Sequence, residues 1–246
     1  TFAVPEGGTA ASVANDGSIT ARDVVLLGTR VFNSGNIVAA RLGRVALASG
    51  SYAVLDLSGD GFLQVLAPAE IAPDDYPLVE VSREGTIVAD GGLVKLDAYT
   101  AYKAVREAIN MKGVIKANSV SEQPGRIVFG TGEGSPVNIS GELDVGPKAN
   151  EDDAPGGHVE IVGSKVDLDF SKLRIGEGGS FRLAADRIWI LSWPGEWDDI
   201  TVLVEYDTND ESRRSDIGDL LRSGVNVTLH GSWGVRWGSG GLAIME

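Results

Sequence analysis

A short phrase that recurs along the chain constrains its fold more than any other feature. The phrase consists of a turn, a glycine, any residue, an isoleucine, any residue and an alanine. It occurs at Asn15–Ala21, Asn33–Ala39, Arg83–Ala89 and Met111–Ala117. Recurrence of one unit predicts that neighbouring copies stack on one another, because a single copy cannot bury its apolar residues alone.

A second phrase follows each copy and begins with a glycine before alternating apolar residues. It occurs at Gly43–Leu47, Gly92–Leu96, Gly125–Phe129 and Gly157–Ile161. Alternation over this length predicts short, half-buried strands. We expect the glycines of both phrases to adopt positive φ angles, and to let one level of the chain pass close above another.

The spacing of the isoleucines predicts a solenoid of stacked strands. Ile19, Ile37, Ile87 and Ile115 are separated by steps of 18, 50 and 28 residues. We therefore expect about 20 to 25 residues per turn, with one longer excursion, and about ten turns stacked about 4.8 Å apart. Equivalent inward side chains would then form continuous ladders of Ile, Val, Leu and Ala.

The composition agrees with an all-β chain and excludes several classes of function. The chain has 246 residues with 33 Gly, 9 Pro, 43% apolar residues and a net charge of -14. Such acidity argues against nucleic acid or an anionic membrane as a partner, because either requires a basic surface. The absence of cysteine excludes disulfides and thiolate zinc sites. No apolar run reaches the length of a membrane-spanning helix.

Four segments interrupt the strand pattern. Leu66–Pro77 holds three prolines and is predicted to be a loop that leaves the stack. Ala98–Ile109 has helical spacing of apolar residues, and Ser215–Gly224 combines a capping serine with a terminating glycine, so both are predicted to be short helices. The acidic stretch Gly146–Gly156 is predicted to be a solvated turn. The strand phrase resumes at Gly157, which favours one domain over residues 1–246.

The same phrases resemble a known family in their order along the chain. They resemble the haemagglutination-activity region of two-partner-secretion exoproteins of the filamentous-haemagglutinin type, over nearly the whole chain. The segments that carry the resemblance are Asn15–Ile19, Val24–Gly28, Val31–Ala39, Gly43–Gly50, Leu78–Val81, Gly85–Leu96, Gly113–Ala117, Gly125–Phe129 and Leu221–Leu229.

This resemblance implies a right-handed parallel β-helix with short helical and loop excursions. It also implies export through an outer-membrane transporter partner and a place on the bacterial cell surface. The expected role is a rigid adhesive rod that contacts glycans or proteins of host or neighbouring cells. The family's usual Asn-Pro-Asn signature is absent, and the chain begins at Thr1. We therefore expect a processed or excised segment of a longer exoprotein.

Catalytic motifs are weak. His158 and His230 belong to no metal-binding or triad motif. Carbohydrate-active β-helix enzymes use paired carboxylates, which Asp167 with Asp169 or the Asp198–Asp199 pair could supply, and such acids could also hold Ca²⁺. In an acidic chain such pairs are usually solvated. We therefore expect a protein that is not an enzyme and has no catalytic residue, cofactor or metal, with a carbohydrate-active enzyme as the alternative.

Aromatic residues suggest where contacts form. All five tryptophans fall in the last sixty residues or so, and an exposed row of them would make a stacking platform for sugars or an interface. The other reading is that they cover the end of the rod or pack under the segment 215–224. An uncapped end is an unpaired strand edge, so end-to-end self-association into an extracellular filament is a further alternative. The candidate binding residues are Trp189, Trp193, Trp197, Trp233 and Trp237.

Overall fold

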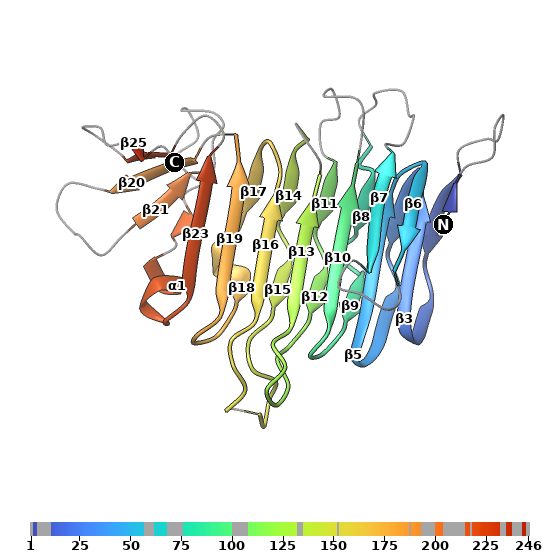
Figure 1. Ribbon diagram of the computed structural model, residues 1–246, viewed down its shortest axis with the longest axis horizontal. Helices are drawn as coiled ribbons and strands as arrows, with labels where there is room; N and C mark the ends of the chain where they lie inside the picture. Colours follow the sequence, from blue (N-terminus) through green and yellow to red (C-terminus); the bar gives the residue numbers. More distant parts are fainter. Residues whose placement is uncertain are drawn as a thin grey trace.

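The computed structural model is built mostly of strands and contains almost no helix (Figure 1). The residues that it describes are 2–3, 11–56, 62–67, 76–99, 108–131, 135–151, 153–186, 188–192, 200–203, 215–216, 218–231, 235–237 and 243–244. Helix is confined, among these, to the short α1 (Gly218–Arg222) and the 3-10 turn η1 (Phe170–Lys172). No helix among the described residues is long and apolar enough to cross a membrane.

One sheet contains six parallel strands, one from each repeat of the chain. Their spatial order is β17-β14-β11-β8-β4-β2, so each strand pairs with its counterparts in the preceding and following repeats. The strands are β2 (Ser12–Asn15), β4 (Arg30–Asn33), β8 (Val79–Val81), β11 (Ile109–Met111), β14 (Val137–Ile139) and β17 (Val166–Leu168).

A second, 11-stranded parallel sheet is curled because two of its strands are long and bend across two faces. These are β3 (Ser18–Gly28) and β5 (Asn36–Ser49). The first part of β5 pairs with β9 and the second part pairs with β10. The first arm continues through β9 (Thr86–Val88), β12 (Val114–Lys116), β15 (Glu142–Asp144) and β18 (Leu173–Arg174). The second arm continues through β10 (Leu93–Ala98), β13 (Arg126–Gly130), β16 (His158–Val162), β19 (Ser180–Ala185) and β23 (Asn226–Gly231).

The chain therefore passes through the six-stranded sheet, the first arm and the second arm in turn, and then goes back to the six-stranded sheet. We call each such passage a level. Six levels are present among the described residues, namely β2–β3, β4–β5, β8–β10, β11–β13, β14–β16 and β17–β19. At about 4.8 Å per level they occupy about 30 Å, and six levels among the described residues are fewer than the expected ten turns. Within the same residues the parallel stack ends at β23.

The register of the first arm confirms the predicted isoleucine ladder. Ile19 pairs with Ile37, which pairs with Ile87, which pairs with Ile115. The ladder then continues through Leu143 and Leu173, which the phrase did not single out. The steps of 18, 50 and 28 residues are thus single levels of the stack with insertions of different length.

The second phrase forms the matching ladder of the second arm. Val45, Val94, Ile127 and Val159 occupy one register position on successive strands and are fully buried or nearly so. Residues between them point to the opposite face, since successive strand side chains alternate. The predicted half-buried strands are confirmed, and most of the core is one continuous cluster of inward Ile, Val, Leu, Phe and Ala.

The glycines of the turns permit close stacking, but not through positive φ angles. No glycine of either phrase, at positions 17, 35, 43, 85, 92, 113, 125 and 157, has a positive φ, so that part of the prediction is wrong. A Cβ added to Gly113 would lie 2.2 Å from the carbonyl oxygen of Gly85 in the level below. That same oxygen accepts a hydrogen bond from the Val114 amide at 3.0 Å. Backbone therefore stacks on backbone at this corner, and any side chain would separate the levels.

A hairpin covers the outer face of the first two levels, and the sequence pattern did not reveal it. It consists of β6 (Tyr52–Leu55) and β7 (Leu63–Ala67), with β1 (Phe2–Ala3) paired to β6. Its apolar side chains pack on Ala46 and Ala48, forming a second small core. The hairpin accounts for much of the step of 50 residues. The predicted proline loop therefore starts later than Leu66, and residues 68–75 lie outside the described residues.

Both helix predictions need correction. Ala98 ends β10 and Ile109 begins β11, while residues 100–107 between them lie outside the described part of the chain. In the second segment, Ser215 belongs to the strand β22 (Ser215–Asp216), so it does not cap a helix. The helix is only the five residues of α1, although Gly224 ends it as predicted, with φ of 77°.

The C-terminal region departs from the parallel stack. A five-stranded sheet in the order β22-β21-β20-β24-β25 follows, and three of its four strand pairs are antiparallel. An antiparallel pair needs no return passage around the stack, so the repeating unit ends here. The additional strands are β20 (Ile188–Ser192), β21 (Ile200–Leu203), β24 (Val235–Trp237) and β25 (Ala243–Ile244).

The stacked turns predict a contrast between two glycine substitutions. Gly113→Ala should lower the free energy of unfolding by about 1–3 kcal/mol, because the added methyl group overlaps the Gly85 carbonyl. Gly17→Ala, at the same position of the phrase in the first level, has no atom within 4 Å of the added Cβ and should be neutral or slightly stabilising. Urea denaturation of both variants measures the difference. If both variants lose the same free energy of unfolding, close backbone stacking is not the reason for glycine at position 113.

Candidate functional site

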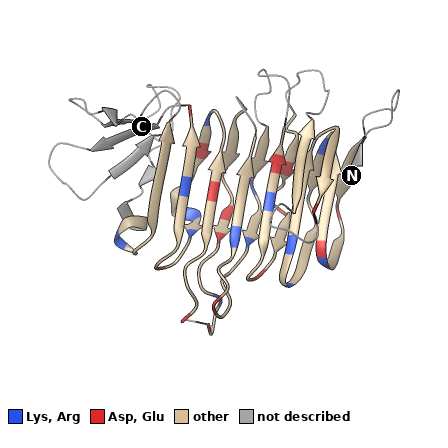
Figure 2. Cartoon of the chain, viewed as in Figure 1, with Lys and Arg blue, Asp and Glu red and all other residues tan. Residues whose placement is uncertain are grey.

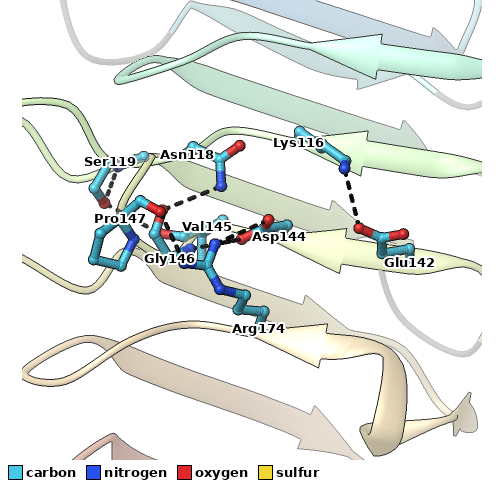
Figure 3. Close-up of polar contacts among 10 residues, drawn as sticks. Lys116, Asn118, Ser119, Glu142, Asp144, Val145, Gly146, Pro147 and Arg174 are labelled. Atoms are coloured by element: carbon cyan, nitrogen blue, oxygen red, sulfur yellow. Dashed lines mark hydrogen bonds and ion pairs between the residues drawn. The ribbon is translucent and has the colours of Figure 1, made fainter. Parts of the chain in front are cut away.

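The most elaborate polar structure in the described residues lies where the first arm passes into the second. Two loops project side by side from the stack, residues 117–125 after β12 and residues 145–157 after β15 (Figures 1 and 3). They are joined by backbone hydrogen bonds, from the Ser119 amide to the Gly146 carbonyl and from the Lys148 amide to the Ser119 carbonyl, both 3.0 Å. We call this pair the corner loops.

Buried side chains hold the base of the corner loops. Ser119 is fully buried, and its hydroxyl donates to the Val145 carbonyl at 3.1 Å and accepts from the Gly125 amide at 3.1 Å. Asn118 donates to the Gly146 carbonyl at 3.2 Å. These bonds satisfy backbone groups that would otherwise be buried without a partner. The stretch 146–156 is therefore an ordered loop with exposed and buried residues, rather than simply a solvated turn.

A two-pronged ion pair connects the next level to these loops (Figure 3). Arg174 Nη1 lies 2.8 Å from Asp144 Oδ1 and 3.0 Å from Asp144 Oδ2, while Arg174 Nη2 donates to the Pro147 carbonyl at 2.8 Å. The same Asp144 carboxylate accepts from the Gly146 amide at 3.0 Å. Only 12% of the Asp144 side chain is exposed, so this charge depends on its partners.

Weaker ion pairs lie toward the solvent. Arg41 contacts Glu151 at 2.9 Å and donates to the Ser121 hydroxyl at 2.8 Å, and Lys148 pairs with Asp90. The Arg41 and Ser121 contacts lower the pKa of the Glu151 carboxyl below its usual value. Exposed pairs of this kind add little stability. They attach the loop tips to β5 at Arg41 and to the turn at Asp90, on two earlier levels.

An open groove adjoins this corner, where the six-stranded sheet turns into the first arm. Its volume is about 500 Å³, and it crosses the turns of three consecutive levels, at residues 112–114, 140–142 and 171–174. We call it the turn groove. Its charged residues are Lys112, Glu142, Lys172 and Arg174, and the hydroxyls of Ser140 and Ser171 also line it. Each of its three cations has a carboxylate partner, namely Glu80 for Lys112, Asp169 for Lys172 and Asp144 for Arg174, so the groove has no excess of positive charge.

Each groove lysine has a partner that leaves it accessible. Lys112 Nζ lies 3.3 Å from Glu80 Oε1, and 38% of its side chain is exposed. Lys172 Nζ lies 3.3 Å from Asp169 Oδ2 and donates to the Ser140 carbonyl at 2.6 Å, with 48% of its side chain exposed. Lys116 pairs with Glu142 at 3.2 Å, on the adjoining outer face of the first arm (Figure 3).

The structure separates the roles of the two predicted strand aspartates. Asp167 lies in the middle of β17, while Asp169 caps η1 through its bond to the Ser171 amide at 3.1 Å. Hydrogen bonds from Ser171 and then from Lys172 lower the pKa of the Asp169 carboxyl. A carboxylate fixed in this way is a structural cap. The Asp198–Asp199 pair lies outside the described residues.

The two histidines lie apart on the outer face of the second arm. His158 Nδ1 is 2.8 Å from the Ser180 hydroxyl, and burial together with nearby Arg126 lowers the pKa of His158. His230 is exposed near the end of β23. No group of three His, Asp or Glu side chains within the described ranges lies close enough together to hold a metal.

The tryptophans cannot be assembled into a site. Trp189 lies in β20 and Trp237 in β24, two paired strands in which the partner of Trp237 is Ile190. Their side chains lie outside the described part of the structure, as do Trp193, Trp197 and Trp233 altogether. A sugar-stacking platform therefore remains a prediction of the sequence.

The sequence pattern missed the residues of the corner loops and the turn groove. Lys112 and Ser140 hold the same position in the turns after β11 and β14, so the signal for these two was a comparison of equivalent turn positions. The turn after β17 has one extra residue, and the register of β15 with β18 places Lys172 opposite Glu142. On the face in view, Figure 2 shows charged residues of both signs spread over separate strands, without a patch of one sign.

The burial of Asp144 predicts that this carboxylate contributes more to stability than the exposed carboxylate of Glu142. Asp144→Asn should lower the free energy of unfolding by about 1.5–3 kcal/mol, because charge-assisted bonds to Arg174 and Gly146 weaken. Glu142→Gln, which removes an exposed ion pair on the same strand, should cost about 0–1 kcal/mol. Hydrogen exchange should quicken at residues 145–151 only in the first variant. Unchanged exchange there would show that Asp144 does not hold the loops.

Comparisons with known proteins add no constraint to this geometry. No protein-family model, curated protein or solved structure matches the chain. Its function is therefore inferred from the stacked levels, the corner loops and the turn groove.

Proposed function

We propose that the chain is a rigid segment of a secreted, cell-surface bacterial adhesin of the filamentous-haemagglutinin type, coiled as a right-handed parallel β-helix. The in-register stacking of six levels, each of which runs through the six-stranded sheet and both arms, carries this proposal. The order of turns that resembles the haemagglutination-activity region follows the same levels. Right-handedness is supported by the strong preference for right-handed connections between parallel strands of one sheet.

Stacked levels suit a protein that must hold a contact surface away from a cell. Every internal level is hydrogen-bonded to two neighbours along three faces, and its turns bond to the turns below. Bending such a stack would open many of these bonds at once. Rigidity therefore comes from the repeat itself, while exposed turns and loops are available for binding.

A binding role is supported over a catalytic one by the polar groups of the described surface. The corner carboxylate Asp144 is committed to Arg174, and Asp169 is committed to its cap and to Lys172. The turn groove offers ammonium and hydroxyl groups along an open channel. These groups suit recognition of a surface polymer better than acid and base chemistry, which needs paired carboxylates flanking a bond.

Attachment to cells is the direct test. Beads coated with the folded chain should attach to epithelial layers or to bacterial lawns, and soluble folded chain should compete with them. Beads coated with heat-unfolded chain are the control, because they carry the same composition and charge. If folded and unfolded coatings attach equally on every surface tried, the adhesive role is wrong.

Self-assembly into an extracellular filament is the second candidate, and the unequal ends of the stack favour it. In the described residues, β2 and β3 are paired on one side only, and Val13, Ile19 and Leu26 are only partly buried. Their register partners Val31, Ile37 and Leu47 are at most 1% exposed. Edges of this kind accept further strands.

The last complete level is covered far better than the first. Leu168 and Leu173 are at most 8% exposed, and Phe170 packs edge-on against Phe181 at 5.4 Å between ring centroids. Leu220 of α1 also belongs to this core. The open level at the other end is therefore where a second copy would add.

A charged residue introduced on the open first level should distinguish the adhesin segment from the self-assembling filament. If the chain self-associates there, its sedimentation coefficient should rise with concentration, and Ile19→Lys should abolish the rise by placing an inward-facing charge on the edge strand. Thr20→Lys, on the exposed side of the same strand, should leave it intact. Circular dichroism checks that both variants stay folded. A wild-type chain that remains monomeric at every concentration would rule out the filament.

A further inference from the structure

We propose that the open first level binds the first level of a second copy, head to head, across a two-fold axis that passes through the bend of β3. Among the described residues this end of the stack is flush, because β2 ends the six-stranded sheet and β3 ends both arms on the same level. Its inward side chains Val13, Ile19 and Leu26 are only partly buried. The inference goes beyond the adhesive function, and it differs from filament growth because it stops at two copies.

The opposite end of the stack has a different shape, which disfavours head-to-tail addition. Among the described residues, the six-stranded sheet ends at β17 and the first arm ends at β18, both on the sixth level. The second arm continues for one more strand, because β19 pairs with β23. A flush first level therefore cannot meet this stepped end along all three faces. Two flush ends can meet, and an interface that uses the same surface of both copies closes at a dimer.

The sequence of β3 has the symmetry that such a pairing requires. Its inward residues are Ile19 and Ala21 before the bend and Val24 and Leu26 after it, since their register partners on β5 lie in the core. Positions 19 and 26 are equally far from the midpoint between residues 22 and 23, and so are positions 21 and 24. An antiparallel partner centred on that midpoint therefore sets Ile19 opposite Leu26 of the second copy. It also sets Ala21 opposite Val24, with all four side chains on the core side.

The bend of β3 makes this pairing compatible with both arms. A two-fold axis that bisects the bend exchanges the arms, so the first arm of one copy lies on the second arm of the other, and the inner side stays inward. At the same corner β5 has residues 40–43 between its two paired segments, and the fourth and fifth levels carry the corner loops. In β3 only Arg22 separates the paired segments. No loop of the first level therefore holds the two copies apart at the axis.

Opposite charges at the bend favour this register over its neighbours. The pairing places the exposed Arg22 opposite Asp23 of the second copy, and the contact occurs twice across the axis. Arg44 holds the Asp23 carboxylate through its amide at 3.0 Å and through Nε and Nη2 at 3.1 Å. A carboxylate has about four acceptor positions, so one remains for a further donor. A register shifted by one residue would oppose two like charges and set inward side chains against outward ones.

Sedimentation across a concentration series tests the number of copies. The mass of the wild-type chain should rise to that of two copies and then stay constant. Arg22→Asp should weaken the dimer by about tenfold or more, because it sets aspartates against each other at both symmetric contacts. Arg126→Asp is the matched control, with the same change of charge at an exposed position of β13, and it should change the affinity by less than about twofold. Circular dichroism checks folding. A mass that stays at one copy, or rises beyond two, would overturn the inference.

Single cysteines test the register, because the chain has no cysteine of its own. The pairing sets Thr20 opposite Val25 of the second copy, and opposite residues of antiparallel strands are close enough for a disulfide. A mixture of Thr20→Cys and Val25→Cys should therefore form a linked dimer under mild oxidation. Either variant alone should not, since its two thiols are separated by five residues of the paired strands, or about 10 Å or more.

Equal cross-linking in the mixture and in the single variants would contradict the two-fold pairing. The outcome is also separable from that of the adhesive function. Bead attachment by a chain that stays monomeric would reject the dimer and leave the adhesive function standing. A cross-linked dimer whose beads attach to no surface would do the reverse.

Discussion

The contact between backbones at the glycine turns is the constraint on which the rest of the structure depends. At Gly35, Gly113 and Gly141, the carbonyl oxygen of the level below lies about where a Cβ would be. Only with this approach can the flanking strands keep their ladder spacing, so that Ile37, Ile87 and Ile115 stack without gaps. The spacing between the layers of the core is therefore fixed at the glycine turns. A wider turn would lengthen every ladder bond that follows it.

A stack of similar levels has two ends and apolar outer surfaces that need to be covered, and the chain covers them to different extents. The hairpin β6–β7 covers the apolar outer surface of the first levels, where Arg44 also lies 4.3 Å above the Phe62 ring. A buried amide pair, Asn15 to Asn33 at 2.7 Å, joins the first two levels internally. At the sixth level, Phe170 of η1 and Leu220 of α1 join the core. Such local additions account for the irregular lengths of the repeat. They also place the more varied side chains outside the ladders.

Polar function follows from the same geometry. Because levels are about 4.8 Å apart, side chains at equivalent turn positions form rows with a fixed period. The turn groove crosses such rows on three levels, where Lys112 is equivalent to Ser140 and Glu142 lies opposite Lys172. The corner loops are a second elaboration, in which Arg174 connects one level to the loop of another through Asp144.

The sequence by itself determined the ladders, because alternation and a glycine before each strand are local properties that recur with every level. Ile19, Ile37, Ile87 and Ile115 were placed in register from their phrase alone, and the strands of the second phrase followed. It could not determine the hairpin at residues 52–67, the strand at Ser215 or the pairing of Asp144 with Arg174. The hairpin and the strand at Ser215 replace expected loop and helix through pairs 8 to 15 positions apart, which neither recurring phrase marks. The pairing of Asp144 with Arg174 joins residues 30 positions apart and depends on which levels lie side by side after insertions of unequal length. Only the tertiary structure decided which turns meet, and hence where a groove could form.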